Sequence, residues 1–250
     1  MKNRKKEKKK ESFGELTRSL FFAIILAMIF RSFLFEPFYI PSGSMKSTLL
    51  VGDYVFVSKY KYGYSRYSFP FGPPIFDGRK LAANEPQRGD VVVFKLPTNT
   101  STNYIKRLIG LPGDEIQVTE GVLYLNGKEV TRERIDNFID SDGKEIPQYI
   151  ETLPSGVSYQ VLDEKYNGGL DNTGIYKVPD DHYFFMGDNR DNSQDSRVLN
   201  HVGFVPKENL LGPANIIFSS TSANLFKFWE WISGFRSDRF LNSVAYEGDK

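Results

Sequence analysis

The sequence predicts a mainly β protein with one N-terminal helix, and three observations lead to that fold class. An apolar segment near the start, 19–35, contains a single charged residue, Arg31. After it, short β-branched or aromatic runs alternate with Gly and Asp, which is typical of strands separated by turns. The chain has 250 residues, which is enough to bury the core of one large domain or two small ones.

The N-terminal helix is predicted to be a membrane anchor over residues 19–36. Arg31 near its outer end can extend its charge to the membrane surface, so the apolar segment reaches the lower limit of a spanning helix. No small-x-small cleavage site follows, which disfavours a removable leader, and a buried core helix stays as the alternative. Because the tail 1–18 is rich in Lys, we expect it in the cytoplasm and the chain after about Pro37 outside it.

Strands are expected where aromatic or β-branched residues cluster between turn residues. Such runs occupy 53–60, 90–96, 115–120 and 182–186. Residues 122–130 are predicted to form a hairpin that turns at Asn126-Gly127. Residues 64–88 are rich in Pro, Gly and aromatic side chains, and they are predicted to form a long loop.

This pattern divides the chain into a main β domain and an insert. Residues 37–115 and 180–218 carry the better patterned strands and are expected to form the main domain. Residues 116–179 are expected to form a smaller inserted subdomain, and the part from 131 onward is more polar and less regular.

The C-terminal segment, 219–250, has its own character. Between Asn224 and Phe240 its aromatic residues follow helical spacing. Two interpretations stay open: a helix packed on the domain, or a helix that lies at a membrane surface.

Composition excludes several kinds of site. The formal net charge is +1, so the total charge gives no indication of nucleic-acid binding. The chain has no cysteine for disulfides or thiol chemistry, and two histidines, His182 and His201, are too few for a histidine-rich metal site. The Asp-rich segment 187–197 does not fit a calcium-binding loop. With Asp191 as the first ligand, Ser196 stands where the loop needs Gly and Val202 where it needs Glu. We therefore expect neither a metal nor a cofactor.

Two serines raise the question of chemistry just after the apolar segment. Ser42 and Ser44 lie in "IPSGSMK", either in a polar turn or in a catalytic site. A serine hydroxyl needs a neighbouring base to become a nucleophile, and the flanking residues do not form a G-x-S-x-G elbow. His182 and His201 lie near the Asp-rich segment, so a histidine triad stays open.

Lysine is the alternative base, provided that burial lowers its pKa. Lys106 in "YIKRLIGLPGD" is flanked by apolar residues on an expected strand. Most lysines in such a pattern are surface residues of an amphipathic strand, so the pattern alone does not decide. The polar segment 187–197 is able to form a network of hydrogen bonds and ion pairs that holds such a lysine.

Taken together and in order, these segments resemble the bacterial type I signal peptidases, the serine–lysine family. The resemblance covers about 20–218 and is densest in "PSGSM", "GDYVFVSKYKYG", "GDVVVFK", "YIKRLIGLPGD" and "MGDNRDNSQDSR". It implies that Ser44 is the nucleophile, that Lys106 is the general base, and that Ser42 and the Ser44 backbone N–H form the oxyanion hole. It also implies an antiparallel β fold with an inserted smaller domain.

The resemblance assigns further residues as well. Ser193 corresponds to a serine that hydrogen-bonds the lysine amine, and Arg107, Asp195 and Arg197 correspond to a supporting salt-bridge network. Two shallow apolar pockets for small substrate residues, as in A-x-A sites, correspond to Phe38, Ile40, Leu49, Val55, Tyr104 and Ile105. One departure is Ser47, where the family usually has proline.

The family resemblance also implies a cellular setting. The substrates would be preproteins that carry signal peptides, and the other partner would be the lipid bilayer. The chain would be a single-pass protein of the cytoplasmic (inner) membrane, with its β domain on the outer (periplasmic) face. The rivals are a self-cleaving repressor-type serine–lysine peptidase and a membrane-tethered β domain that binds an exported partner without chemistry.

Overall fold

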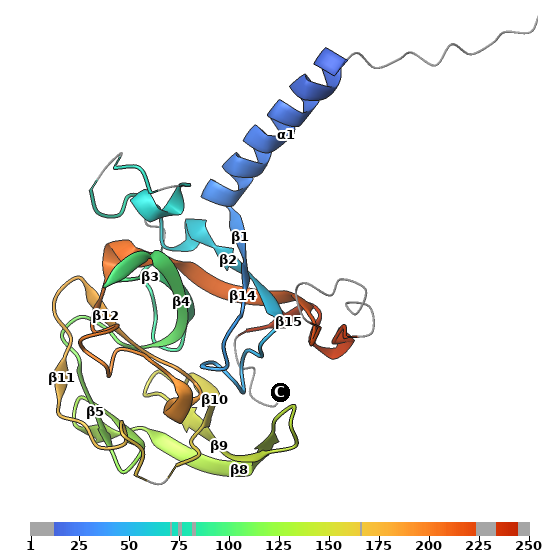
Figure 1. Cartoon of the computed structure of the whole chain (residues 1–250). Helices are drawn as coiled ribbons and strands as arrows, with labels where there is room; N and C mark the ends of the chain where they lie inside the picture. Colours follow the sequence, from blue (N-terminus) through green and yellow to red (C-terminus); the bar gives the residue numbers. More distant parts are fainter. Residues whose placement is uncertain are drawn as a thin grey trace, which may run out of the picture.

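In the computed structural model, residues 13–70, 72–74, 77–81, 84–165, 167–223 and 234–244 are described. One α-helix stands away from a β body that contains the rest of the described chain (Figure 1). The predicted mainly β fold with an N-terminal helix is confirmed.

Helix α1 (Phe13–Phe33) is mostly apolar and mostly exposed, and it contacts the β body near its C-terminal end. Its Gly14–Phe33 stretch has a mean hydropathy of 1.7, and 6% of it is buried. At ~1.5 Å per residue, this stretch extends about 30 Å, which matches the hydrocarbon core of a bilayer. A core helix of a soluble protein buries one face, so the buried-helix alternative does not fit.

The helix limits differ from the predicted 19–36 at both ends. The helix begins at Phe13 and ends at Phe33, because Phe35 and Glu36 already belong to a strand, β1 (Phe35–Tyr39). Glu36 is buried and ion-paired with Lys59 of the β body, and Pro37 lacks the N–H needed to continue a helix. Hydropathy alone does not reveal that Glu36 has a distant partner, so the sequence placed the end too late.

The main sheet is antiparallel throughout, and its strand order is β1-β2-β14-β3-β4-β12-β13. Its other strands are β2 (Asp53–Ser58), β14 (Leu210–Ser220), β3 (Val91–Leu96), β4 (Asn99–Gly110), β12 (His182–Met186) and β13 (Val205–Pro206), and β15 (Asn242–Ser243) pairs with β14. The four strand runs predicted outside the hairpin all contain strands. In chain order these strands are β2, β3, β5 (Glu115–Thr119) and β12.

The insert contains two small antiparallel sheets. One has the order β11-β5-β6-β7, and the other β10-β9-β8. The remaining strands are β6 (Val122–Leu125), β7 (Lys128–Glu129), β8 (Thr131–Ile139), β9 (Glu145–Thr152), β10 (Ser158–Leu162) and β11 (Tyr176–Lys177). The predicted Asn126-Gly127 turn is confirmed, and both of its residues have positive φ.

Regular strands also occupy part of 131–179, where the sequence pattern is more polar and less regular. The reason is exposure: β8 leaves most of its side chains in solvent, so it shows no apolar alternation to detect. Short 3₁₀ helices complete the described secondary structure: η1 (Lys59–Lys61), η2 (Arg66–Ser68), η3 (Arg190–Asn192), η4 (Lys207–Asn209) and η6 (Ser237–Arg239).

The insert shares its core with the main sheet. Ile109 of β4 and Phe184 of β12 belong to the same buried cluster as Leu123 of β6 and Tyr159 of β10. Packing therefore fixes the position of the insert against β4 and β12 of the main sheet.

The C-terminal segment is attached to the sheet by charge. Of the helix predicted between Asn224 and Phe240, residues 224–233 lie outside the described part, and 234–240 form a turn and η6. Arg239 binds the fully buried carboxylate of Asp53 at 2.6 Å, and Arg236 lies 3.6 Å from it. These described residues pack on the domain.

Candidate active site

Ser44 and Lys106 lie in direct contact. Ser44 lies in the turn that follows β1, and Lys106 lies on β4, which reaches the same place through the sheet. Lys106 Nζ is 2.6 Å from Ser44 Oγ. Both side chains are buried, at 7% and 4% exposure, at one end of a cavity of about 570 Å³. This is the pairing that a serine nucleophile and its base require.

The surroundings of Lys106 favour its neutral form. Burial lowers the pKa of Lys106 to about 8, while the carboxylates of Asp195 and Asp188 oppose the shift. Its amine contacts the Ser44 hydroxyl and the Ile105 carbonyl oxygen, but no carboxylate. At pH 7 about a tenth of Lys106 is therefore uncharged and able to accept a proton.

Ser42 lies on the cavity side of the same turn. Its hydroxyl oxygen is 3.4 Å from Ser44 Oγ, and both residues line the cavity. A hydroxyl in this place is able to donate to an oxygen that develops charge beside Ser44.

Asn189 holds the turn in position, although it is not among the site residues predicted from the sequence. Its side-chain amide donates to the Gly43 carbonyl at 3.0 Å, and its backbone N–H donates to the Ser44 carbonyl at 3.1 Å. Gly187 lies so close that a Cβ there would be 2.6 Å from the Ser44 carbonyl oxygen. Gly187 thus permits a close backbone approach to Ser44, while Asn189 binds the turn through its side chain and its backbone.

Ser47 shows what accompanies the missing proline. Its φ is +83°, in the left-handed region that the proline ring cannot adopt. Its hydroxyl donates to the Gln160 carbonyl of β10 at 3.0 Å. The turn therefore has a conformation specific to a non-proline residue and is attached to the insert.

The predicted salt-bridge network consists of two separate buried pairs near the dyad. Arg107 binds Asp188 with two hydrogen bonds of 2.8 and 2.6 Å, and Arg197 binds Asp195 with bonds of 2.9 and 2.8 Å. The Asp188 carboxylate also accepts from the hydroxyl of Thr48, just beyond the turn. Asp188 was missed because the Asp-rich segment offers several equivalent carboxylates.

A third buried pair joins the insert to this region. Arg190 of η3 binds Glu151 of β9, whose carboxylate also accepts from the Tyr159 hydroxyl at 2.9 Å. The Arg107 guanidinium lies over the Tyr159 ring, 4.4 Å from its centre. The insert thus braces the segment that carries Asn189.

Ser193 lines the cavity but does not make the predicted hydrogen bond to Lys106. Its backbone is extended, and its hydroxyl lies against Gly187, where an added Cβ would be 2.2 Å away. The Ser193 hydroxyl has no hydrogen-bond partner within the described ranges of the chain, and its role in orienting Lys106 stays a prediction.

The predicted pocket residues divide into two groups. Phe38, Ile40, Tyr104 and Ile105 line the cavity. Leu49 and Val55 are fully buried beneath it, in the same cluster as Ile40. Their positions are therefore corrected: they support the cavity lining from the core.

Neither histidine provides a triad. His201 Nε2 is 2.9 Å from the Tyr104 hydroxyl, and His182 Nδ1 is 2.8 Å from the Asp180 carbonyl oxygen. Among the described residues, the titratable side chain in hydrogen-bond contact with Ser44 Oγ is Lys106.

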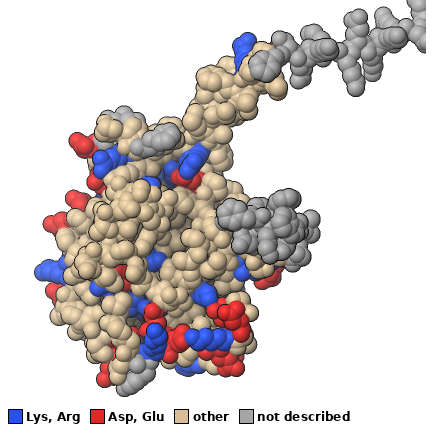
Figure 2. Space-filling view, in the orientation of Figure 1, with Lys and Arg blue, Asp and Glu red and all other residues tan. Residues whose placement is uncertain are grey.

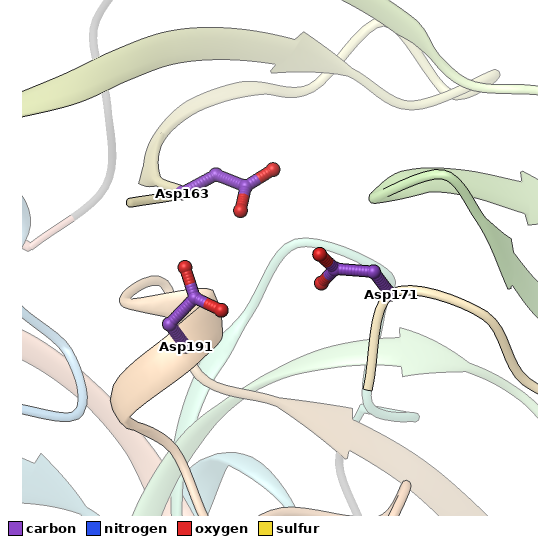
Figure 3. Close-up of side chains that lie close together, drawn as sticks. All are labelled: Asp163, Asp171 and Asp191. Atoms are coloured by element: carbon purple, nitrogen blue, oxygen red, sulfur yellow. The ribbon is translucent and has the colours of Figure 1, made fainter. Parts of the chain in front are cut away.

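Three aspartates, one of them in η3, lie close together. Figure 3 shows the carboxylates of Asp163, Asp171 and Asp191 directed toward one another from three segments, with oxygens within 4.8 Å. Asp163 is ion-paired with Arg132, and burial together with the neighbouring carboxylates raises its pKa. Asp191 accepts two backbone N–H groups. The expectation of no metal stays a prediction.

Comparison with known proteins identifies the family. Residues 13–219 match the family model described as "Signal peptidase, peptidase S26". The chain belongs to this peptidase family. The signal peptidase I of Rickettsia typhi is 41% identical over 97% of this chain and 98% of its own length. The signal peptidase I of Rickettsia prowazekii is 41% identical over 94% of both chains.

Among solved structures, a signal peptidase I from Enterococcus faecalis V583 is 27% identical. It covers 52% of this chain and 97% of its own, with a TM-score of 0.34. The family assignment rests on the sequence matches, which extend over nearly the whole chain. The protein is thus a serine peptidase, a hydrolase of the signal peptidase family.

Proposed function

We propose that this peptidase removes N-terminal signal peptides from exported preproteins with a Ser44–Lys106 dyad. The observation that carries the proposal is the 2.6 Å contact between Ser44 Oγ and a buried lysine whose pKa is lowered to about 8. A lysine of ordinary pKa would be charged at neutral pH and unable to act as a base.

The chemistry is acyl transfer in two stages. Neutral Lys106 accepts the Ser44 proton while Ser44 Oγ attacks the scissile carbonyl, and protonated Lys106 then donates to the leaving amine. A water, deprotonated by Lys106, releases the acyl group from Ser44. The Ser42 hydroxyl and the Ser44 N–H stabilise the oxyanion, and one such donor typically contributes about a hundredfold or more in rate.

Substrate selection follows from the cavity lining. Phe38, Ile40, Tyr104 and Ile105 present apolar surface beside the dyad, with Leu49 and Val55 behind it. This lining suits small side chains at the first and third positions before the cut, as in A-x-A sites.

Helix α1 is proposed to anchor the enzyme in the inner membrane. The basic residues of the tail favour a cytoplasmic N-terminus, which leaves the β domain on the periplasmic face. Strand β1 leads from α1 directly to the turn with Ser44, so a substrate cleavage site that emerges from the bilayer meets the dyad nearby. A protease-protection assay tests this topology.

Cleavage of a preprotein with an Ala-x-Ala site tests the dyad. Ser44→Ala and Lys106→Ala are each expected to abolish cleavage, whereas Lys61→Ala, which removes a lysine away from the cavity, is expected to keep it. Retained cleavage by Lys106→Ala would remove Lys106 as base. Undiminished cleavage by Ser44→Ala would favour a domain that binds its partner without chemistry at this serine.

A further inference from the structure

A second cavity, of about 580 Å³, lies where α1 joins the β body. Its lining includes four cationic side chains and one acidic side chain, namely Arg31, Lys59, Arg66, Lys95 and Glu36. Figure 2 shows Lys and Arg atoms gathered at this junction. The cavity is distinct from the one at the dyad, although Asn103 lines both.

Positive charge in this cavity exceeds the available negative charge. Glu36 is occupied twice: one oxygen accepts from Arg31 Nε at 2.8 Å, and the other lies 2.5 Å from Lys59 Nζ. Neither Lys95 nor Arg66 is in ion-pair contact with a carboxylate in the described part of the chain. The lining therefore leaves cationic groups available to an added anion.

The unpaired cations are partly removed from water. Burial lowers the pKa of Lys95, and the neighbouring Arg31 lowers it further against the opposing effect of Glu36. Arg66 donates to the Tyr67 hydroxyl at 2.6 Å, but its Nε has no hydrogen-bond partner. Bringing like charges together in a partly buried place is costly unless an anion compensates them.

The position of the cavity indicates where that anion comes from. Phe33, the last residue of α1, packs against the rings of Tyr64 and Phe69, with centres 5.4 Å apart in both cases. Phe69 also lines the cavity. Aromatic side chains at the end of a spanning helix mark the level of the lipid head groups, and phosphate is the anion present there.

We propose that this cavity binds the phosphate of an anionic phospholipid from the outer leaflet. The inference rests on the proposed membrane anchoring by α1. Arg66 and Lys95 bind the phosphate oxygens, a role for which guanidinium and ammonium groups are suited. Glu36 holds Arg31 and Lys59 in place. A bound lipid then fixes the orientation of the β domain on the membrane, next to the cavity that receives the substrate.

Photo-crosslinking of the full-length chain tests the proposal. The probe is a phosphatidylglycerol with a photoreactive head group, added to Ser44→Ala protein in nanodiscs, and the labelled peptides are identified by mass spectrometry. Ser44→Ala keeps the result independent of peptidase activity, so failure of the lipid site and failure of the dyad are separate outcomes. We expect labelling within 66–74 or 95–103, competed by unlabelled phosphatidylglycerol but not by phosphatidylcholine.

Variants of the cavity sharpen the test. Lys95→Gln is expected to weaken labelling roughly fivefold, the effect of about one cationic contact with an anionic lipid. Lys61→Gln removes the same charge from a lysine outside the cavity and is expected to leave labelling unchanged. Ser101→Glu, on the exposed rim, supplies the missing carboxylate and is expected to weaken labelling even if Lys95→Gln misfolds.

Several results would overturn the proposal. Equal competition by phosphatidylcholine, or equal labelling of Lys95→Gln and wild type, would show that the cavity does not select an anionic lipid. Full competition by millimolar inorganic phosphate would assign the site to a free anion. Competition by a signal peptide with acidic residues upstream of its cleavage site, lost in a neutral peptide, would assign it to the substrate instead.

Discussion

Two buried lysines in this molecule have different partners, and the difference shows what makes a lysine a base. Lys106 and Lys59 are 4% and 3% exposed, and burial lowers the pKa of both. Lys59 contacts the Glu36 carboxylate, which opposes the shift. Lys106 contacts a serine hydroxyl, and the nearest carboxylates, Asp188 and Asp195, are engaged by arginines.

Burial therefore supplies only half of the condition. A buried lysine in contact with a carboxylate forms a structural ion pair, as Lys59 does with Glu36. Lys106 combines burial with carboxylates already bound to Arg107 and Arg197, and its pKa is lowered to about 8. Because Arg107 binds Asp188 and Arg197 binds Asp195, neither carboxylate forms an ion pair with Lys106.

Exchanging each lysine for arginine tests this contrast most strongly. Lys106→Arg is expected to lower kcat/KM by about a thousandfold, because arginine does not give up its proton and a general base contributes rates of that order. Lys59→Arg keeps an ion pair with Glu36 and is expected to retain most of the cleavage rate. Preprotein cleavage by both purified variants is the measurement, and equal rates would contradict the assigned roles.

Removing the partner of Lys59 is expected to have the largest effect on stability. Glu36→Gln leaves Lys59 buried and unpaired, which should lower the free energy of unfolding by about 3–5 kcal/mol. Chemical denaturation of the protein in detergent measures it. The control is Glu164→Gln, whose partner Lys144 is exposed, and a change below about 1 kcal/mol is expected there. A similar loss of unfolding free energy in both variants would mean that the Lys59–Glu36 pair stabilises the fold no more than an exposed ion pair does.

Giving Lys106 a carboxylate should make it resemble Lys59. Ser193→Asp adds a negative charge to the cavity that Lys106 lines, which should raise the pKa of Lys106 and slow cleavage at neutral pH roughly ten- to a hundredfold. The rate should return as the pH is raised. Ser193→Asn is the uncharged control of the same shape, and an unchanged pH profile in Ser193→Asp would argue against neutral Lys106 as the base.

The pH–rate profile of the wild type should follow the titration of Lys106. With the neutral amine as the proposed active form, kcat/KM should fall by about tenfold per pH unit below the pKa of about 8. A rate that instead rises around pH 6.5, together with loss of cleavage in His182→Ala, would indicate a histidine base.

The titration of Lys106 should also change the free energy of unfolding, although by a smaller amount. The unfolded chain keeps the Lys106 proton up to the ordinary lysine pKa, while the folded chain releases it near 8. Between these values the unfolded state binds more protons, so the free energy of unfolding should rise with pH by up to ~1.4 kcal/mol per unit. Denaturation of Lys106→Met across this range should show a smaller rise; an identical rise would contradict the lowered pKa.

The sequence by itself determined the fold class, the helix and the order of the blocks that carry the family resemblance. These features are local or are patterns of residue type: an apolar segment with a single charged residue predicted α1, and aromatic or β-branched runs between turn residues predicted β2, β3, β5 and β12. It also singled out Ser44 and Lys106, although they stand 62 positions apart and nothing in the intervening sequence requires their contact.

Only the tertiary structure decided the partners. Asp188 rather than Asp195 binds Arg107, Glu36 leaves the helix to meet Lys59, Ser193 turns its hydroxyl toward Gly187, and Asn189 holds the Ser44 turn. Each outcome depends on distances between segments far apart in the chain. A pattern of residue types shows which groups are able to pair, whereas packing and burial determine which of them meet and which stay charged.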